Sequence, residues 1–290
     1  MARETSGLKP AAGDTRPIGL FDSGVGGLSV WREVLRQLPQ ESTVYVADQA
    51  HIPYGPQPGE RLRAYAEGIT QWLLARDCKA IVVACNAASA AALKHLRARF
   101  PQLPFIGMEP AVKPAATATR SGTVAVLATP ATLRGELFAA TAQRYAQGTR
   151  IIGEPCPGLV EQIESGAALT PQTEAMLRGF LAPALAAGAD HVVLACTHYP
   201  FVIEPIRRIV GGGVEVIDPA PAVVRQLGRV LAERGLAAPP QAVTHHHATT
   251  AVVEHYAAAL KALLGVTAPV EALKWLDDAR LQPRADVVTA

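Results

Sequence analysis

The chain has 290 residues, of which 49% are hydrophobic and 18% charged, and its 27 basic residues nearly balance 25 acidic ones. This composition excludes a disordered chain, and without a long run of one charge sign no nucleic-acid partner is expected. A single core rarely grows to this length, so we expect two domains.

Residues 1–17 are polar and interrupted by Pro and Gly. This segment lacks the apolar core of a signal peptide, and no later stretch is apolar over enough residues to cross a bilayer. We therefore expect a soluble, cytoplasmic protein with no membrane partner. Thiols stay reduced in that compartment, so the cysteines are expected to be catalytic, metal-binding or buried.

Short apolar runs alternate with longer amphipathic stretches along the chain. The runs predict strands over 18–21, 44–46, 80–83, 123–127, 191–194 and 214–217. Apolar residues recur at helical spacing over 28–38 and 62–72, which predicts two helices that cover a sheet. This alternation is typical of an α/β protein with parallel sheets flanked by helices.

A glycine-rich turn, FDSGVGG at 21–27, follows the first predicted strand and opens a helix. Its glycines and hydroxyl can bring backbone N–H groups to a carboxylate or a phosphate. The glycine spacing does not fit the dinucleotide-binding fingerprint. The alternative is a tight strand-to-helix connection in which Asp22 is only an N-cap.

A cysteine directly follows each of two buried-looking strands, in IVVACNAA at 81–88 and VVLACTHY at 192–199. Ligands of open parallel sheets bind beyond the carboxyl ends of the strands, which is where Cys85 and Cys196 are expected. A helix N-terminus lowers the pKa of a thiol, so both are predicted to be usable thiolates. Moving the α-proton of an amino acid from one face to the other needs two such opposed bases. The alternative is that both are small buried hydrophobic residues.

Other cysteines and a histidine have alternative interpretations. His198 follows Cys196 by two residues and is predicted to hold or relay its proton, or instead to cap a helix. A zinc site of Cys85, Cys196 and His198 would lack the usual short-spaced cysteine pair. Cys78 and Cys156 are predicted to be structural, because neither is expected between the end of a strand and the start of a helix.

The composition changes after about residue 235. The histidine run at 245–247 predicts a solvated loop, since no ligand partners for a metal accompany it. An Ala/Leu-rich stretch that ends near Asp278 predicts a helix. We interpret this region as an appendage to the first domain.

Four motifs occur in order: FDSGVGGLSV at 21–30, PYG at 53–55, VVACNAAS at 82–89 and LACTHYP at 194–200. Together they resemble the glutamate racemase family of the aspartate/glutamate racemase superfamily, over residues 17 to 235. The resemblance implies an isomerase that interconverts L- and D-glutamate by a two-base mechanism, with no cofactor and no metal. It also implies that D-glutamate supplies peptidoglycan synthesis, and hence cell wall biogenesis and cell shape.

The resemblance further implies two pseudo-symmetric α/β domains with the active site in the cleft between them. The first domain would comprise 1–107 and 218–290, including an N-terminal polar tail and the C-terminal appendage. The second would comprise 108–217. A homodimer with glutamate as its small-molecule substrate is expected.

The resemblance also assigns roles by position. Cys85 and Cys196 would be the two bases, assisted by Asp22 and His198 respectively, with Glu161 as a further catalytic acidic residue. Substrate contacts are expected from Asp22, Ser23, Tyr54, Gly55, Asn86, Ala87, Thr129, Thr132, Thr197 and His198.

One position departs from the family pattern. The family usually has Thr directly after the Asn of the first cysteine motif, and this chain has Ala87. A lost hydrogen bond to a charged group costs about 1.5–3 kcal/mol. Weaker glutamate binding or a preference for another small acid such as aspartate is therefore an alternative, as is a non-catalytic anion-binding module.

Overall fold

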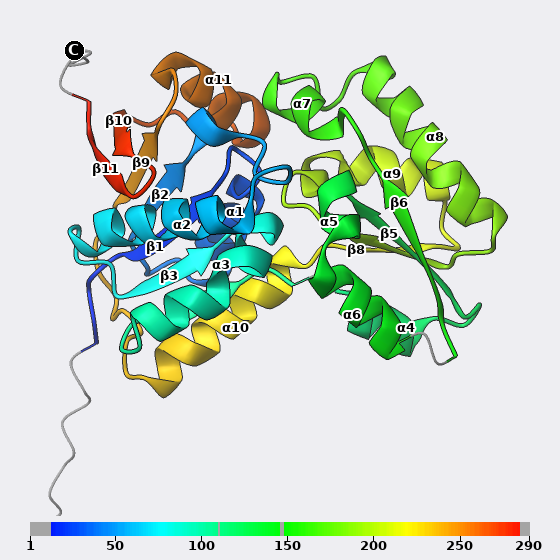
Figure 1. Ribbon diagram of the computed structural model, residues 1–290, viewed down its shortest axis with the longest axis horizontal. Coiled ribbons are helices and arrows are strands. Elements are labelled where there is room, and N and C mark those ends of the chain that lie inside the picture. Colours follow the sequence, from blue (N-terminus) through cyan, green and yellow to red (C-terminus); the bar gives the residue numbers. More distant parts are fainter. Residues whose placement is uncertain (1–12, 110, 146–147, 285–290) are drawn as a thin grey trace, which may run out of the picture.

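The computed structural model describes residues 13–109, 111–145 and 148–284, so the predicted N-terminal tail lies largely outside the described residues. The chain forms two separate sheets with helices on both faces of each (Figure 1). This arrangement confirms the predicted α/β class with flanked parallel sheets. Within the described segments, no helix is both long and apolar enough to span a bilayer.

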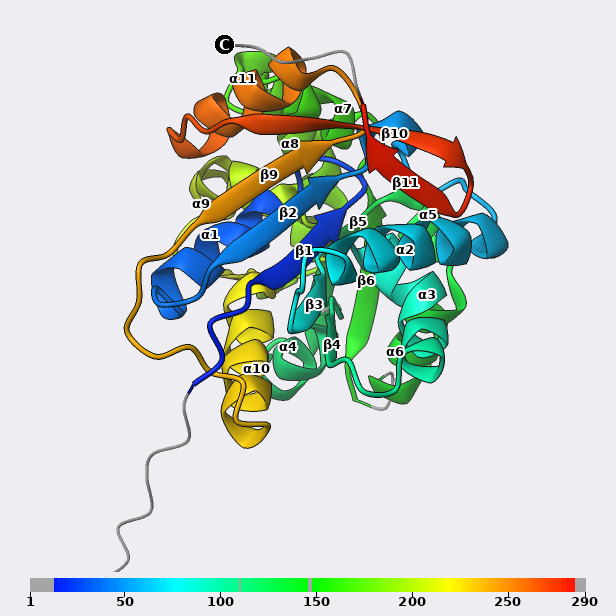
Figure 2. The same cartoon turned by 90° about the vertical axis from the view of Figure 1, so that its left-hand side faces the viewer.

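The first sheet has seven strands. They are β1 (Ile18–Asp22), β2 (Thr43–Ala47), β3 (Ala80–Val83), β4 (Phe105–Gly107), β9 (His245–Thr249), β10 (Val270–Asp277) and β11 (Arg280–Pro283). Their order is β11-β10-β9-β2-β1-β3-β4, and only the β10–β11 pair is antiparallel. One face is covered by α1 (Leu28–Gln37), α10 (Ala220–Glu233) and α11 (Val253–Leu264), and the other by α2 (Gly59–Leu74) and α3 (Asn86–Arg99) (Figure 2).

The second sheet has four parallel strands. They are β5 (Thr123–Ala128), β6 (Arg150–Pro155), β7 (His191–Leu194) and β8 (Glu215–Ile217), in the order β6-β5-β7-β8. One face packs against α4 (Val112–Ala118), α5 (Pro130–Arg134) and α6 (Glu136–Tyr145), and the other against α7 (Leu159–Glu164), α8 (Pro171–Ala186) and α9 (Ile203–Val210). Two 3₁₀ turns, η1 (Gln49–His51) and η2 (Tyr199–Val202), complete the two halves.

The chain passes from the first sheet to the second after β4 and returns after β8. Val112 of α4 packs in the core of the second sheet, and Val223 of α10 packs in the core of the first. The predicted domain boundaries, 107/108 and 217/218, fall in these two connections. That the two halves are separate domains with these boundaries stays a prediction.

All six predicted strands are present. Five of them are fully buried runs, and the sixth, β8, is partly buried. The C-terminal interpretation was wrong in two places. The histidine run is not a solvated loop: it begins β9, which pairs in parallel with β2, and His247 is fully buried against Tyr256 with Nδ1 2.8 Å from Oη. The Ala/Leu-rich helix ends at Leu264, and residues 270–277 form a strand.

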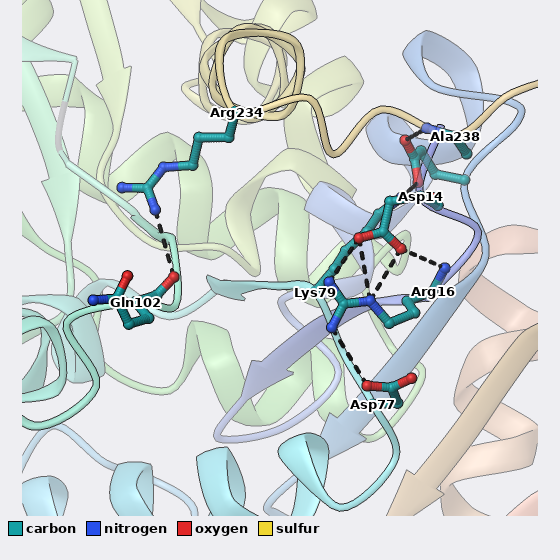
Figure 3. A network of polar contacts seen from close by, with 8 residues as sticks. Asp14, Arg16, Asp77, Lys79, Gln102, Arg234 and Ala238 are labelled. Atoms are coloured by element: carbon teal, nitrogen blue, oxygen red, sulfur yellow. Dashed lines mark hydrogen bonds and ion pairs between the residues drawn. The ribbon is translucent and has the colours of Figure 1, made fainter. Parts of the chain in front are cut away.

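A network of charges holds the segment before β1 at the amino ends of the strands (Figure 3). Arg16 pairs with Asp14 at 2.7 Å and with Asp77 at 3.4 Å. Lys79, which precedes β3, contacts the buried carboxylate of Glu41 at 2.6 Å. These ion pairs lie at the amino ends of the strands of the first sheet. Cys85 lies beyond the opposite, carboxyl end of β3.

Candidate active site

A cavity of about 40 Å³ lies between the two sheets, at the carboxyl ends of their strands. It is lined by Ser23, Ile52, Pro53, Tyr54, Gly55, Cys85, Asn86, Ala87, Thr129, Thr132, Val160, Ala195, Cys196, Thr197 and His198. Cys85 follows β3 of the first sheet and Cys196 follows β7 of the second. The fold therefore brings both cysteines, and most of the predicted substrate contacts, to one cavity.

Cys85 lies at the N-cap of α3 and is almost fully buried, and its thiol donates to Ser23 Oγ at 3.9 Å. Burial raises the pKa of this thiol well above its usual range, and the Asp22 carboxylate raises it further. The backbone N–H groups of Ala88 and Ser23 act in the opposite direction but do not outweigh burial. The expectation that the helix N-terminus makes Cys85 a thiolate was therefore wrong: it holds its proton at neutral pH.

Asp22 is completely buried beside Cys85 and outside the lining of the cavity. One carboxyl oxygen, Oδ2, accepts from the Gly27 N–H at 2.8 Å, and burial raises the pKa of the group. The backbone contact to Gly27 fits the predicted strand-to-helix connection. The place of Asp22 next to the thiol fits its predicted role at the Cys85 side.

The second cysteine has a different environment. Cys196 Sγ lies 3.6 Å from Nδ1 of His198, and His198 Nε2 lies 2.7 Å from Oε1 of Glu164. Burial disfavours the charged imidazolium, but the contacts with Cys196 and Glu164 prevail and raise the pKa of His198 well above its usual range. The imidazolium of His198 is therefore the charged group next to the Cys196 sulfur. Cys196 is followed by η2 and not directly by an α-helix, so the helix N-terminus expected beside it is absent from this part of the described structure.

Glu164 is a residue of the candidate site that the sequence does not predict. It ends α7 and accepts from the Val25 N–H at 2.8 Å and from Gln49 Nε2 at 2.9 Å, in addition to its contact with His198. Burial opposes its negative charge, but these contacts lower the pKa of the carboxyl. The predicted acidic residue, Glu161, is exposed one turn earlier and does not line the 40 Å³ cavity. No signal in the sequence separates the two glutamates.

The glycines of the FDSGVGG turn allow the second half of the chain to approach the first. A Cβ atom at Gly24 would collide with the Glu164 carboxylate, and one at Gly26 would collide with the His198 ring. Ser29, at the start of α1, donates its hydroxyl to the Thr197 carbonyl at 2.8 Å. The turn therefore serves close contact between the two halves, which the sequence analysis did not anticipate.

The predicted substrate-binding side chains differ in whether their polar atoms already have hydrogen-bond partners. Both amide atoms of Asn86 are buried without a hydrogen-bond partner in the described structure, on the wall of the cavity. The hydroxyls of Thr129 and Thr132 lie 2.9 Å apart and pair with each other. The Tyr54 hydroxyl donates to Asp48 at 2.6 Å, so it is already engaged. Among these predicted substrate contacts, Asn86 has buried donor and acceptor atoms that a bound substrate can satisfy.

The remaining thiols lie away from the cavity. Cys156 does follow β6 and precede α7, contrary to what the sequence analysis assumed, yet burial raises its pKa to about 12. Burial also raises the pKa of Cys78 to about 12. Both values fit the predicted structural roles. Over the described ranges, no cluster of three or more potential ligands could hold a metal ion.

Comparison with known proteins places these observations in a family. The chain matches the family model described as Asp/Glu/hydantoin racemase over residues 18–227. It is 56% identical over 221 residues to a glutamate racemase of Roseiflexus sp., which covers 76% of this chain and 81% of that protein. Two solved structures are similar in fold: a glutamate racemase isoform from Bacillus anthracis (TM-score 0.80, 29% identity, 91% of this chain and 98% of that one) and the Francisella tularensis glutamate racemase in complex with D-glutamate (TM-score 0.78, 28% identity, 89% and 97%).

Proposed function

Because the chain belongs to the Asp/Glu/hydantoin racemase family and is an isomerase of the glutamate racemase type, we propose that Cys85 and Cys196 interconvert L- and D-glutamate by proton transfer without a cofactor. The observation that carries this proposal is the position of the two thiols. They come from different sheets and line the same cavity. A substrate held between them has a proton acceptor on one face of Cα and a proton donor on the other.

The two cysteines have different surroundings. Cys85 keeps its proton because burial and Asp22 raise its pKa. Cys196 is next to the His198 imidazolium, which Glu164 holds in place. The Cys196 sulfur then takes the α-proton of one enantiomer, and the Cys85 thiol gives its proton to the opposite face. After this turnover the proton positions are reversed, and the enzyme is ready for the other enantiomer.

The carbanion formed between these steps needs stabilisation by the site. The cavity is buried and lined by few charges, so fixed dipoles act strongly there. The unpartnered amide of Asn86 provides two N–H donors for a substrate carboxylate. The backbone N–H groups that follow the strand ends add further donors. We propose Ser23, Thr197 and Gly55 as the neighbouring binding positions, since all three line the cavity.

The cavity must expand to admit an amino acid. A volume of 40 Å³ holds only about three water molecules. Hydrogen bonds of Val25 and Gln49 with Glu164, and of Ser29 with Thr197, join the two halves next to it. We propose that the halves separate at these contacts to bind glutamate, and that their closure excludes water from the carbanion.

The direct test is an NMR experiment with L-glutamate in deuterated buffer and no added cofactor. We expect the α-proton signal to disappear while D-glutamate accumulates, because the returning proton comes from a solvent-exchanged thiol. L-aspartate in the same assay tests the alternative substrate. Retention of the α-proton of glutamate would contradict the proposed function.

Ala87→Thr is expected to improve glutamate turnover. Ala87 lines the cavity next to Asn86, and a hydroxyl there can donate to a substrate carboxylate. Such a bond contributes about 1.5–3 kcal/mol, so we expect kcat/KM to rise roughly 10- to 100-fold, mainly through KM. Ala98→Thr, at an exposed position of the same helix, is the matched control. Equal effects of the two substitutions would remove Ala87 from the binding site.

Three further properties are part of the proposal. We propose that the D-glutamate product supplies peptidoglycan synthesis, that the chain acts in the cytoplasm, and that it forms a homodimer. The domain boundaries at 107/108 and 217/218 belong to the same proposal, since the halves would move about these connections. Sedimentation velocity measures the state of association.

A further inference from the structure

A larger cavity of about 730 Å³ lies directly beside the catalytic one. It is bounded by α2 and α3 of the first half and by α5 and α6 of the second. The two cavities share four wall residues: Gly55, Asn86, Ala87 and Thr132. We call the larger cavity the vestibule, because it shares these walls with the cavity that the two cysteines line.

The boundary between the vestibule and the catalytic cavity is a contact between the two halves. A Cβ atom at Gly55 would lie 2.8 Å from the side chain of Ala131, so the loop before α2 touches α5 there. Thr132, the next residue of α5, lines both cavities. Separation of the halves at this contact would join the two spaces into one.

The charges on the two walls differ. Among the described residues, neither a lysine nor an arginine lines the catalytic cavity. The vestibule has one such residue on its described wall, Arg63 of α2, and no acidic residue lines it there. Glutamate carries two carboxylates at neutral pH, and Arg63 is a cation that one of them can meet on the vestibule wall.

Arg63 is also available for a ligand. It is partly buried, and within the part of the chain that the structure describes it forms no hydrogen bond or ion pair. Its neighbour Arg61 lies 3.7 Å from Asp278 and Arg76 lies 2.7 Å from Glu271. A guanidinium presents paired N–H donors that fit a carboxylate. Arg63 is partly desolvated without a partner, so a bound carboxylate would offset the cost of that desolvation.

Resting on the proposed function, we propose that the vestibule is the route by which acidic substrates reach the cysteines and that Arg63 captures a substrate carboxylate there. Arg63 is a binding residue and does not touch the reacting carbon. Its positive charge raises the local concentration of amino acids with a net negative charge at the opening of the cleft. The closed catalytic cavity, which lacks a lysine or arginine on its described wall, then receives a substrate that has already been selected for negative charge.

The test compares Arg63→Gln with Arg61→Gln, two equal charge changes that lie two residues apart on the same helix. For Arg63→Gln we expect KM for both glutamate enantiomers to rise about tenfold with kcat changed less than about twofold, since a capture contact acts on binding. Raising the salt concentration from about 0.01 M to about 0.1 M should lower kcat/KM of the wild type and of Arg61→Gln more than that of Arg63→Gln. Arg63→Lys should restore part of the loss, because it keeps the charge.

Two results would overturn the proposal. One is an Arg63→Gln variant whose KM and salt dependence equal those of Arg61→Gln. The other is a loss confined to kcat, which would place Arg63 in a structural or catalytic role. Calorimetric titration of wild type and variants with D-glutamate separates this proposal from the proposed function. Binding that depends on Arg63 in a protein that does not racemise glutamate would contradict only the function.

Discussion

Replacing Cys85 by serine is expected to stop racemisation of both glutamate enantiomers. A serine hydroxyl cannot supply the proton that the buried Cys85 thiol holds, and loss of a positioned acid or base costs about 10²- to 10⁴-fold in rate. Because the two enantiomers have equal free energy in solution, kcat/KM must fall by the same factor in both directions. Optical rotation or a coupled assay for D-glutamate measures this loss.

Exchange of the α-proton with deuterated solvent distinguishes the roles of the two thiols. In Cys85→Ser, Cys196 can still remove and return the α-proton of the one enantiomer that presents it to that side of the cavity. In Cys196→Ser the other enantiomer should exchange. Cys78→Ser, a buried thiol outside the cavity, is the control and should retain full activity. Full racemase activity in Cys85→Ser would refute the two-base mechanism.

Much of this site could be predicted because its residues belong to local patterns. Cys85 and Cys196 each follow a fully buried parallel strand, and such strands are readily recognised as short apolar runs. Strands of one parallel sheet end at the same edge, which predicts where each thiol lies. Most of the predicted substrate contacts in the motifs around them line the same cavity for this reason.

The parts that could not be predicted depend on contacts between distant segments. Strand β9 forms because β2, about 200 residues earlier in the chain, offers it an edge, and nothing in the polar run HHH indicates that partner. The raised pKa of Cys85 is set by the depth of its burial beside Asp22, which outweighs the helix N-terminus that the sequence does reveal. Tertiary packing decided both outcomes.

The choice between Glu161 and Glu164 shows the same limit. Both lie on α7, three residues apart and thus on neighbouring parts of one helix face. Only the position of α7 against the turn at Gly24 and Gly26 brings Glu164 to His198. A sequence pattern gives the helix but does not give this distance.

Glu164→Gln is therefore expected to shift the pH dependence of the enzyme as well as to lower its rate. The contact with Glu164 is one of the causes that raise the pKa of His198, so its loss lowers that pKa. Activity that needs the imidazolium is present below the pKa of His198 and is lost as the pH rises through it. The alkaline limb of the kcat/KM profile should therefore move to lower pH. Loss of the charged hydrogen bond should also reduce kcat/KM roughly 10- to 100-fold.

Glu161→Gln is the matched comparison, since it removes the same charge one turn earlier from an exposed position. If Glu164 holds the imidazolium, the alkaline limb of Glu161→Gln stays where it is in the wild type. If the limb moves in Glu161→Gln and not in Glu164→Gln, the role expected from the sequence is the correct one. Because the two variants have the same net charge, a difference between their profiles reports the 2.7 Å contact between Glu164 and His198 and not a general change in electrostatic potential.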